Sequence, residues 1–300
     1  MDKNGVSIII CTYNRADLLT ECLESFVTQT IFPANMEIIV VNNNSTDNTE
    51  AVVETFKGKL TGLSCVNETN IGLSYARNRG VKESVYDWVC YMDDDAKAHK
   101  NYVERLFYVM NNCNYDGFGG MFYPWYRSPK PAWLSPEFGK MTLLRTTLGP
   151  LAKGKTVAGG ICAFNKEKLL KAGGFPNDIG MRGDVVGYGE ENYLQDNMWA
   201  NGDTIGFDPD WKMDHLVAEY KYTLSWHLKR NFGKGRDYQI SKGSLSFIQK
   251  LIHLFRAIVI ALVLGLKNLP RLFTSSTYYR QNWILDAVGY SYKMFGKISV

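Results

Sequence analysis

The sequence predicts an α/β domain built on a mainly parallel sheet, followed by a helical region. Short β-branched runs alternate with helical periodicity from residue 6 to about residue 110, and the last third becomes basic and strongly apolar. Strands that alternate with helices are typical of a parallel sheet. The 300 residues are 45% apolar and 21% charged, an ordinary globular composition that can bury a sizeable core. The net charge of +4 is too small to indicate a nucleic-acid binder.

The first half of the chain carries the clearest strand signals. Residues 6–11 (VSIIIC) are apolar on both faces, which suits a central parallel strand. The expected elements are, in order, strand 6–11, a helix carrying residues 18–27, strand 36–41, a helix carrying residues 52–56, strand 60–67, a loop and helix within 70–84, strand 88–92 and helix 102–110.

The second half is less regular. Residues 117–139 are rich in glycine, proline and aromatic residues, which predicts a loop or lid. The glycine pair inside the strand expected at 157–164 suggests close approach of another segment or a ligand. The remaining expected elements are helix 166–172, a glycine-rich loop up to residue 192, helix 193–201, strand 204–207 and a final strand before Asp214.

The C-terminal region is basic and apolar. Basic residues outnumber acidic ones from Lys221 onward, and residues 257–266 (AIVIALVLGL) are about half the roughly 20 residues that span a bilayer. We therefore expect residues 247–272 to lie in a membrane interface, with docking on the domain core as the alternative. A basic region beside apolar helices also suits a phosphorylated ligand.

Polar clusters follow the ends of several expected strands, at 12–15, 42–47, 70–78 and 93–95. Ligands of parallel α/β sheets bind beyond the carboxyl ends of the strands, so four such clusters predict one pocket. The cluster Asp93, Asp94 and Asp95 could cap a helix, join a salt-bridge network or bind a hard divalent cation. A helix cap would use only one of these carboxylates, and the spacing does not fit an EF-hand.

The order of the motifs VSIIICTYNR, IIVVNNNSTD, NIGLSYARNRG, YMDDDA, GGF, YGEENYL and DHLV resembles a family-2 glycosyltransferase of GT-A fold, of the bacterial cell-envelope polysaccharide type. The resemblance covers roughly residues 5–236. It implies a Rossmann-like, mainly parallel sheet flanked by helices in a domain 1–236, with a nucleotide-sugar half (1–98) and an acceptor half (99–236). Residues 237–300 would then form a C-terminal helical extension that can associate with a membrane.

The resemblance also assigns the aspartate cluster. In that family its last carboxylate binds a divalent cation, so Asp95 would hold Mn²⁺ or Mg²⁺ and Asp93 would face the ribose of the donor, with Asp94 in the same nucleotide-binding group. A late histidine binds the metal or touches the diphosphate in several such enzymes, and His215 matches it.

Other donor contacts are implied at the remaining strand ends. Arg77 resembles the family's donor-contacting arginine, and Asn43 stands where many members carry an aspartate that contacts the base. An amide both donates and accepts hydrogen bonds, so uridine is only the default base, and a UDP-sugar the default donor. The segment that matches the nucleobase and diphosphate site consists of Thr12, Tyr13, Asn14 and Arg15.

The glutamate pair in YGEENYL matches the family's catalytic pair, whose second member is the base. Glu191 would therefore take the proton from the acceptor hydroxyl, and Glu190 is the second choice. Without the resemblance, two solvated glutamates at a helix start would be the simpler interpretation.

These features together predict a metal-dependent, inverting hexosyltransferase-type enzyme that uses a nucleotide-sugar donor and a saccharide or lipid-linked acceptor, in polysaccharide or glycolipid synthesis. A nucleotidyltransferase acting on sugar phosphates is an alternative, although residues 12–19 (TYNRADLL) contain no glycine to grip a triphosphate. A catalytically inactive sugar-nucleotide or lipid-binding module is another, because Asn42, Asn43 and Glu191 depart from the family pattern.

The expected location is the cytoplasm, peripheral on the inner face of the cell membrane, with no nucleic acid as a partner. The six cysteines form no CxxC pair, which favours a reducing compartment without zinc or structural disulfides. A strand begins almost at once, so we expect no signal peptide.

Overall fold

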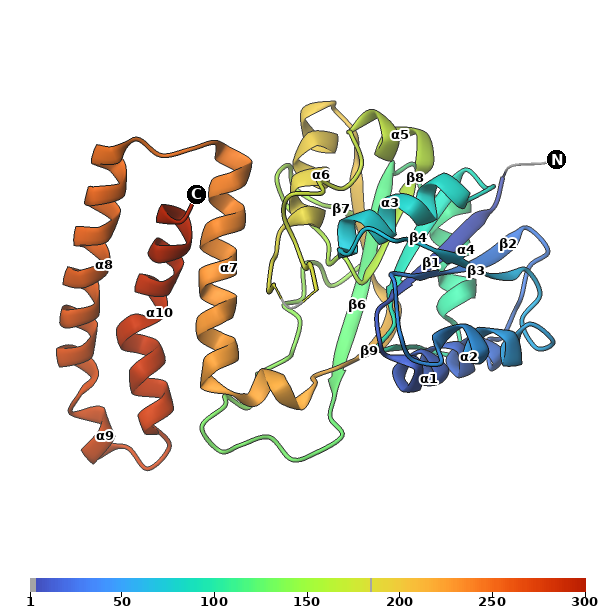
Figure 1. Cartoon of the computed structure of the whole chain (residues 1–300). Coiled ribbons are helices and arrows are strands. Elements are labelled where there is room, and N and C mark those ends of the chain that lie inside the picture. The colour runs from blue at the N-terminus through green and yellow to red at the C-terminus, as the bar shows by residue number, and fades with distance from the viewer. Residues whose placement is uncertain (1–3, 184) are drawn as a thin grey trace. The chain divides into compact units, whose positions relative to one another are not determined.

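The computed structural model describes residues 4–183 and 185–300 and confirms an α/β fold with a central sheet flanked by helices (Figure 1). The chain forms two compact units. The first consists of Met1–Trp125, Lys140–Asn177 and Glu190–Leu216, and the second of Tyr126–Gly139, Asp178–Gly189 and Val217–Val300. The boundary expected at residue 236 lies inside helix α7 (Leu224–Lys242), and the division into functional domains stays a prediction.

The first unit contains the sheet and the helices that cover it. Its elements are β1 (Val6–Thr12), α1 (Ala16–Val27), β2 (Met36–Asn42), α2 (Thr49–Phe56), β3 (Leu63–Asn67), α3 (Leu73–Glu83), β4 (Trp88–Asp93), β5 (Ala96–Ala98), α4 (Tyr102–Asn112), β6 (Gly117–Trp125), β7 (Gly149–Pro150), β8 (Ile161–Asn165), α5 (Lys166–Lys171), α6 (Glu190–Ala200) and β9 (Ile205–Leu216).

Within the described residues the strands form one nine-stranded sheet in the order β3-β2-β1-β4-β8-β6-β9-β5, with β7 beside β9. Strands β1 to β4 run parallel to one another, as do β6 and β9, whereas β5 and β7 pair antiparallel with β9. Strand β8 runs antiparallel between β4 and β6 and so joins the two parallel parts. The carboxyl ends of β1, β2 and β4 therefore meet at one edge of the sheet.

Both faces of the sheet are buried, as the apolar run at residues 6–11 predicts. Ile8 and Ile10 pack in a core with side chains of α1, α2 and α4, whereas Ile9 packs with side chains of α3, α5 and α6. A strand covered on both faces needs apolar residues on both of them, which explains why residues 8–10 do not alternate with polar ones.

Gly80 of α3 packs directly on β1. A Cβ atom at this position would lie 2.4 Å from Cγ2 of Ile9. We expect Gly80→Ala to lower the free energy of unfolding by about 1–2 kcal/mol, because overpacking outweighs the better helix propensity of alanine. Gly58→Ala is the control, because nothing lies within 4 Å of a Cβ there. Equal urea midpoints for the two variants would show that α3 can move away from β1.

The loop expected over residues 117–139 is wrong for its first part, because Gly117–Trp125 form strand β6. The glycines that hide this strand in the sequence are required by its neighbours. A Cβ on Gly119 would lie 2.3 Å from Val157, and one on Gly120 would lie 2.3 Å from the carbonyl oxygen of Trp211. Two flanking strands thus stabilise a segment of low intrinsic β propensity.

The second unit is largely helical. Its elements in chain order are the 3₁₀ turn η1 (Glu219–Tyr222), α7 (Leu224–Lys242), α8 (Phe247–Asn268), α9 (Arg271–Thr274) and α10 (Arg280–Ile298). Helix α10 packs against both α7 and α8 (Figure 1). Glycines allow the contact with α7: a Cβ on Gly235 would lie 1.8 Å from the carbonyl oxygen of Lys293.

One side of helix α8 packs against α10, and the other side is exposed. Ser291 Oγ donates to the carbonyl oxygen of Ala257 (2.7 Å), and Trp283 Nε1 donates to that of Gly265 (2.9 Å). The outward side exposes an apolar stripe with helical spacing that includes Phe247, Ile248, Leu251, Phe255, Ile258, Leu262 and Leu266. A contiguous exposed apolar surface of this kind is typical of a protein or membrane contact.

Helix α8 lies within the range 247–272 that the sequence indicated. It has 22 residues, which corresponds to about 33 Å. The helical stretch Phe247–Thr274 has a mean hydropathy of 2.0 over its most apolar window, and within the described residues it is the one helix long and apolar enough to cross a membrane. By length and composition this helix could cross a bilayer, and the interfacial position expected for residues 247–272 stays a prediction.

Candidate active site

The aspartate cluster lies where β4 ends and β5 begins. Strand β4 ends at Asp93, and β5 then pairs antiparallel with β9 so that Ala96 lies opposite His215. The backbone N–H of Leu216 donates to the carbonyl oxygen of Asp95 (3.0 Å). This pairing brings His215 to the aspartates, although more than a hundred residues separate them in sequence.

Asp93, Asp95 and His215 converge. His215 Nε2 lies 3.2 Å from Asp95 Oδ1 and 3.5 Å from Asp93 Oδ2. One ligand atom from each of the three side chains lies within 4.8 Å of the other two. The side chain of Asp94 points elsewhere, since Arg15 Nη1 donates to its Oδ1 (3.0 Å) and also approaches Asp95 Oδ2 (3.4 Å).

The buried carboxylates depend on neighbouring positive charge. Burial raises the pKa of Asp94 to about 6, against the opposing effect of Arg15. Burial would also raise the pKa of Asp93, but the hydrogen bond and charge of His215 hold it below its ordinary value. Burial would lower the pKa of His215, but Asp95 and Asp93 raise it to about 9. In this structure Arg15 and His215 supply that positive charge.

A divalent cation fits this cluster. Two carboxylates and one imidazole offer the oxygen and nitrogen ligands that Mn²⁺ accepts, and Mg²⁺ also prefers carboxylate oxygen. The positive charge that protonated His215 gives to Asp93 and Asp95 is the charge that a bound metal ion would give them.

A buried ion pair lies beside the cluster. Arg77 of α3 is 4% exposed, and its Nη1 donates to Glu190 Oε1 (2.9 Å) while its Nη2 lies 3.8 Å from Asp93 Oδ1. Burial would lower the pKa of Arg77, but Glu190 and Asp93 raise it above its ordinary value. Burial and the charge of Glu191 raise the pKa of Glu190 to about 7, against the effect of Arg77.

The glycine pair noted in the sequence makes room for these side chains. A Cβ on Gly160 would lie 2.1 Å from Asp93 Oδ2. A Cβ on Gly159 would lie 3.0 Å from Arg77 Nη2 and 3.2 Å from Cβ of Glu191. The close approach expected from the sequence is thus made by charged side chains of the site.

We expect Arg77→Met to lower the free energy of unfolding by about 3–5 kcal/mol, because it leaves the Glu190 carboxylate buried without its partner. Adding Glu190→Gln should restore part of the loss. Arg79→Met is the control on the same helix, because its pair with Glu83 is on the surface and contributes about 0–1 kcal/mol. Urea unfolding of wild type and of the three variants measures these differences. A loss as small as that of Arg79→Met would contradict a buried charge at Glu190.

Residues 12–15, at the end of β1, lie at the same edge of the sheet as the aspartate cluster. Thr12 is buried, Tyr13 is exposed, and Asn14 has a left-handed backbone (φ 52°). Asn14 is turned toward the loop after β2, because Thr46 N–H donates to its Oδ1 (2.7 Å) and its own N–H donates to Ser45 Oγ (2.9 Å). Of these predicted site residues, only Arg15 reaches the aspartates through a described side-chain ion pair.

The side chain of Asn43 connects two loops. Its Nδ2 donates to the carbonyl oxygens of Glu68 (3.0 Å) and Asn70 (2.7 Å), and its Oδ1 accepts from the N–H of Gly72 (2.8 Å). The loop between β3 and α3 is therefore attached to the end of β2. The sequence analysis did not predict this role. The signal for it was the asparagine itself, because an amide can donate hydrogen bonds and a carboxylate cannot.

The last expected site residue, Glu191, lies at the start of α6 beside Glu190. Its side chain is half-buried, and its charge adds to the field at Arg77. The structure therefore brings Arg15, Arg77, Asp93, Asp94, Asp95, Glu190, Glu191 and His215 into one group of charges within the first unit.

This sheet, with an aspartate cluster at a strand end, defines a glycosyltransferase of GT-A fold. The profile of Glycosyl transferase family 2 matches residues 7–173, so the chain belongs to that family and the enzyme class expected from the sequence is confirmed.

Known relatives agree with this class. The chain is 25% identical over 241 residues to the glucosyl-dolichyl phosphate glucuronosyltransferase of Haloferax volcanii, covering 78% of this chain and 76% of the relative. It is 26% identical over 239 residues to the succinoglycan biosynthesis protein ExoM of Rhizobium meliloti, covering 78% and 74%. A solved structure of the mannosyltransferase PcManGT from Pyrobaculum calidifontis, in complex with GDP-mannose and Mn²⁺, shares the fold with a TM-score of 0.61 at 20% identity, covering 94% of this chain and 85% of that one.

Proposed function

We propose that the protein is a metal-dependent, inverting glycosyltransferase that moves a sugar from a nucleoside diphosphate to a hydroxyl group of a saccharide or lipid-linked acceptor. The observation that carries this proposal is the convergence of Asp93, Asp95 and His215 beside the Arg77–Glu190 pair. Family membership favours sugar transfer over nucleotidyl transfer.

In this proposal Asp95 and His215 hold Mn²⁺ or Mg²⁺, and Asp93 faces the ribose. A divalent cation supplies Lewis-acid stabilisation of the negative charge on a departing diphosphate. Arg15 reaches the cluster from the start of α1 with a partly exposed guanidinium, which suits contact with a phosphate oxygen. Arg77 is buried, so its role is to fix the carboxylates of Asp93 and Glu190.

We assign the general base to Glu191. Glu190 Oε1 is engaged by Arg77, and the whole side chain is buried, so an acceptor hydroxyl cannot easily reach it. Glu191 is half-buried and lies next to Gly159, where no Cβ limits access. A carboxylate within hydrogen-bond reach of the acceptor removes its proton as the hydroxyl attacks the anomeric carbon.

The donor in this proposal is a UDP-sugar. Because the Asn43 amide is occupied by the loop that precedes α3, its influence on the base acts through the position of that loop. The mannosyltransferase PcManGT was solved in complex with GDP-mannose, so GDP-sugars are the donors to compare with UDP-sugars.

The test of this proposal is a panel of UDP-sugars and GDP-sugars, measured by the shift in melting temperature with Mn²⁺ and with EDTA. A ligand at 100 times its Kd stabilises the folded protein by about 2.7 kcal/mol, and a shift of about 5 °C is therefore expected for a UDP-sugar with Mn²⁺. A shift with GDP-sugars alone would contradict the proposed base. Shifts that persist in EDTA would contradict the metal, and no shift with any donor would contradict the function.

The acceptor and location follow from the relatives and from α8. One relative is named for a dolichyl phosphate substrate and another for succinoglycan biosynthesis, which supports glycolipid or polysaccharide synthesis. The exposed apolar stripe of α8 supports peripheral attachment to the inner face of the cytoplasmic membrane. Since the other side of α8 packs on α10, which carries Asp286 and Lys293, α8 would contact lipid along one side only.

A further inference from the structure

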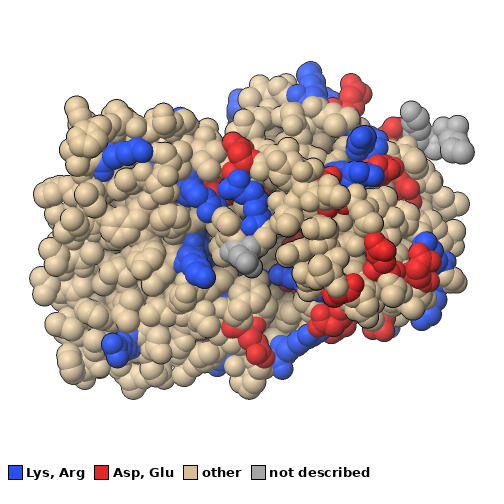
Figure 2. Space-filling view, in the orientation of Figure 1, with Lys and Arg blue, Asp and Glu red and all other residues tan. Residues whose placement is uncertain are grey.

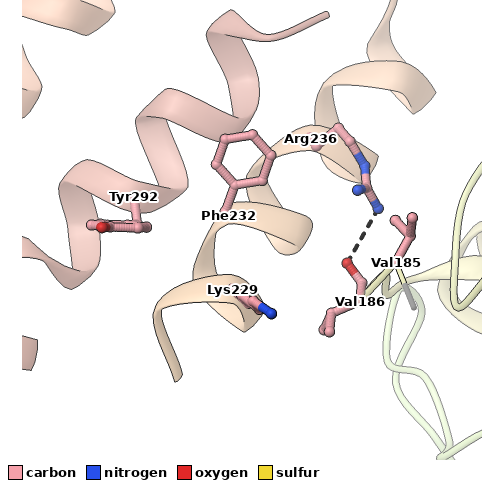
Figure 3. A pocket seen from close by; sticks show the side chains of 6 residues that line it. All are labelled: Val185, Val186, Lys229, Phe232, Arg236 and Tyr292. Atoms are coloured by element: carbon pink, nitrogen blue, oxygen red, sulfur yellow. Dashed lines mark hydrogen bonds between the residues drawn. The ribbon is translucent and has the colours of Figure 1, made fainter. Parts of the chain in front are cut away.

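A cavity of about 230 Å³ lies within the second unit (Figure 3). Three segments of that unit line it: the glycine-rich loop before α6, helix α7 and helix α10. The lining residues are Val185, Val186, Lys229, Phe232, Arg236 and Tyr292. It is smaller than the cavities of about 300–1,000 Å³ that enclose whole small molecules, so it suits one chemical group of a larger ligand.

The lining combines cations with apolar surface. Lys229, Phe232 and Arg236 stand at i, i+3 and i+7 of α7 and therefore share one face of the helix. Val185 and Val186 form the opposite wall, and Tyr292 comes from α10 (Figure 3). A phosphate attached to a glycerol or hydrocarbon group has the matching combination of charge and apolar surface.

The guanidinium of Arg236 is held in place. Its Nε donates to Asp237 Oδ1 (2.7 Å), and its Nη2 donates to the carbonyl oxygen of Val186 (3.2 Å). Oδ2 of the buried Asp237 accepts from the N–H groups of Gly180 (3.1 Å) and Tyr188 (2.8 Å). One carboxylate thus fixes both the loop and the arginine, so this wall of the cavity is prepared before a ligand arrives.

The cavity keeps a positive charge. Asp237 balances Arg236, whereas Lys229 is exposed and has no ion pair among the described residues. Two further basic residues of α7, Arg230 and Lys234, lie over the ring of Tyr188 at 5.7 and 5.5 Å. Figure 2 shows Lys and Arg side chains gathered over α7, while the visible surface of α8 carries few charges. The local potential therefore favours an anion.

We propose that this cavity binds the phosphate of an anionic phospholipid headgroup. This inference rests on the membrane contact proposed for α8, which is in the same unit. A lipid phosphate fits better than free phosphate, because four of the six lining side chains are aliphatic or aromatic. Lys229 and Arg236 then add selectivity for anionic lipid to the non-selective apolar contact of α8.

The test is co-sedimentation of the full-length protein with phosphatidylcholine vesicles and with vesicles that also contain phosphatidylglycerol. Each basic side chain near an anionic surface contributes about fivefold in affinity, so Lys229→Gln/Arg236→Gln should lose about 30-fold of the preference for phosphatidylglycerol. Binding to pure phosphatidylcholine should stay unchanged. The matched control is Lys221→Gln/Lys242→Gln, which removes the same charge from the same unit outside the cavity. Lys229→Glu alone keeps the test valid if the double variant does not fold, because it breaks no described contact.

Equal losses in the cavity variant and the control variant would overturn the proposal, because they would show a general charge effect. A melting shift of wild type with millimolar inorganic phosphate, lost in the cavity variant, would show that free phosphate is the ligand and would also overturn it. Donor hydrolysis by wild type without vesicles tests the proposed transferase separately. A protein that hydrolyses the donor but binds all vesicles equally contradicts only the cavity proposal.

Discussion

Glu191→Gln is expected to lower Mn²⁺-dependent hydrolysis of the donor by about 10²–10⁴-fold, while the variant still binds the nucleotide sugar. The amide has nearly the same size as the carboxylate but cannot accept a proton from the attacking water or hydroxyl. Because hydrolysis uses water as the nucleophile, the experiment needs no knowledge of the acceptor. Release of the nucleoside diphosphate measures the rate, and the donor-induced shift in melting temperature measures binding.

Asp196→Asn is the matched control for this prediction. It removes one carboxylate from an exposed position of the same helix, α6, and should leave hydrolysis within about twofold. If Glu190→Gln abolished hydrolysis and Glu191→Gln did not, the base would be the other member of the pair. If wild type bound the donor and turned over none of it, the protein would be the inactive sugar-nucleotide module.

Asp95→Asn is expected to reduce Mn²⁺-dependent hydrolysis by about 10³-fold or more. Stabilisation of a leaving diphosphate by a metal ion is worth several kcal/mol, and Asp95 is the carboxylate that would hold the ion. Its oxygens lie 3.2 Å from His215 Nε2 and 3.4 Å from Arg15 Nη1. An amide has no negative charge, so it would weaken both of these contacts. Titration calorimetry with Mn²⁺ should show the loss of binding directly.

Asp214→Asn is the control, because Asp214 is the neighbour of His215 on β9 and pairs with His99 at the surface. It should bind Mn²⁺ as wild type does. Unchanged Mn²⁺ affinity in Asp95→Asn would refute the metal site, even if hydrolysis fell.

The sequence predicts the first half of the sheet well for a physical reason. Strands buried on both faces are mostly apolar on both of them, so runs such as residues 6–11 are distinct from loops and from amphipathic helices. The strand ends are then visible as abrupt polar clusters. The observed sheet confirms the fold class, and the match to the family profile confirms the family.

The sequence does not predict contacts made by pairing of distant strands. His215 reaches Asp95 because β5 pairs with β9, and no local pattern specifies that register. Strand β6 was predicted as a loop because its glycines resemble loop signals, and the first two thirds of α7 received no prediction of secondary structure. In α7, Gly233 and Gly235 serve close packing: a Cβ on either would overlap a carbonyl oxygen, that of Val186 or of Lys293.

The Asn43 amide limits how this enzyme can be re-engineered. Installing the aspartate that is usual in such enzymes would set a carboxylate against the carbonyl oxygens of Glu68 and Asn70, which now receive its two hydrogens. The carboxylate oxygen in place of Nδ2 and the two carbonyl oxygens would repel one another, because no proton would lie between them, and this would weaken the attachment of the loop between β3 and α3 to the end of β2. An aspartate at position 43 therefore requires a redesigned 68–72 segment as well, because the two are joined by these hydrogen bonds.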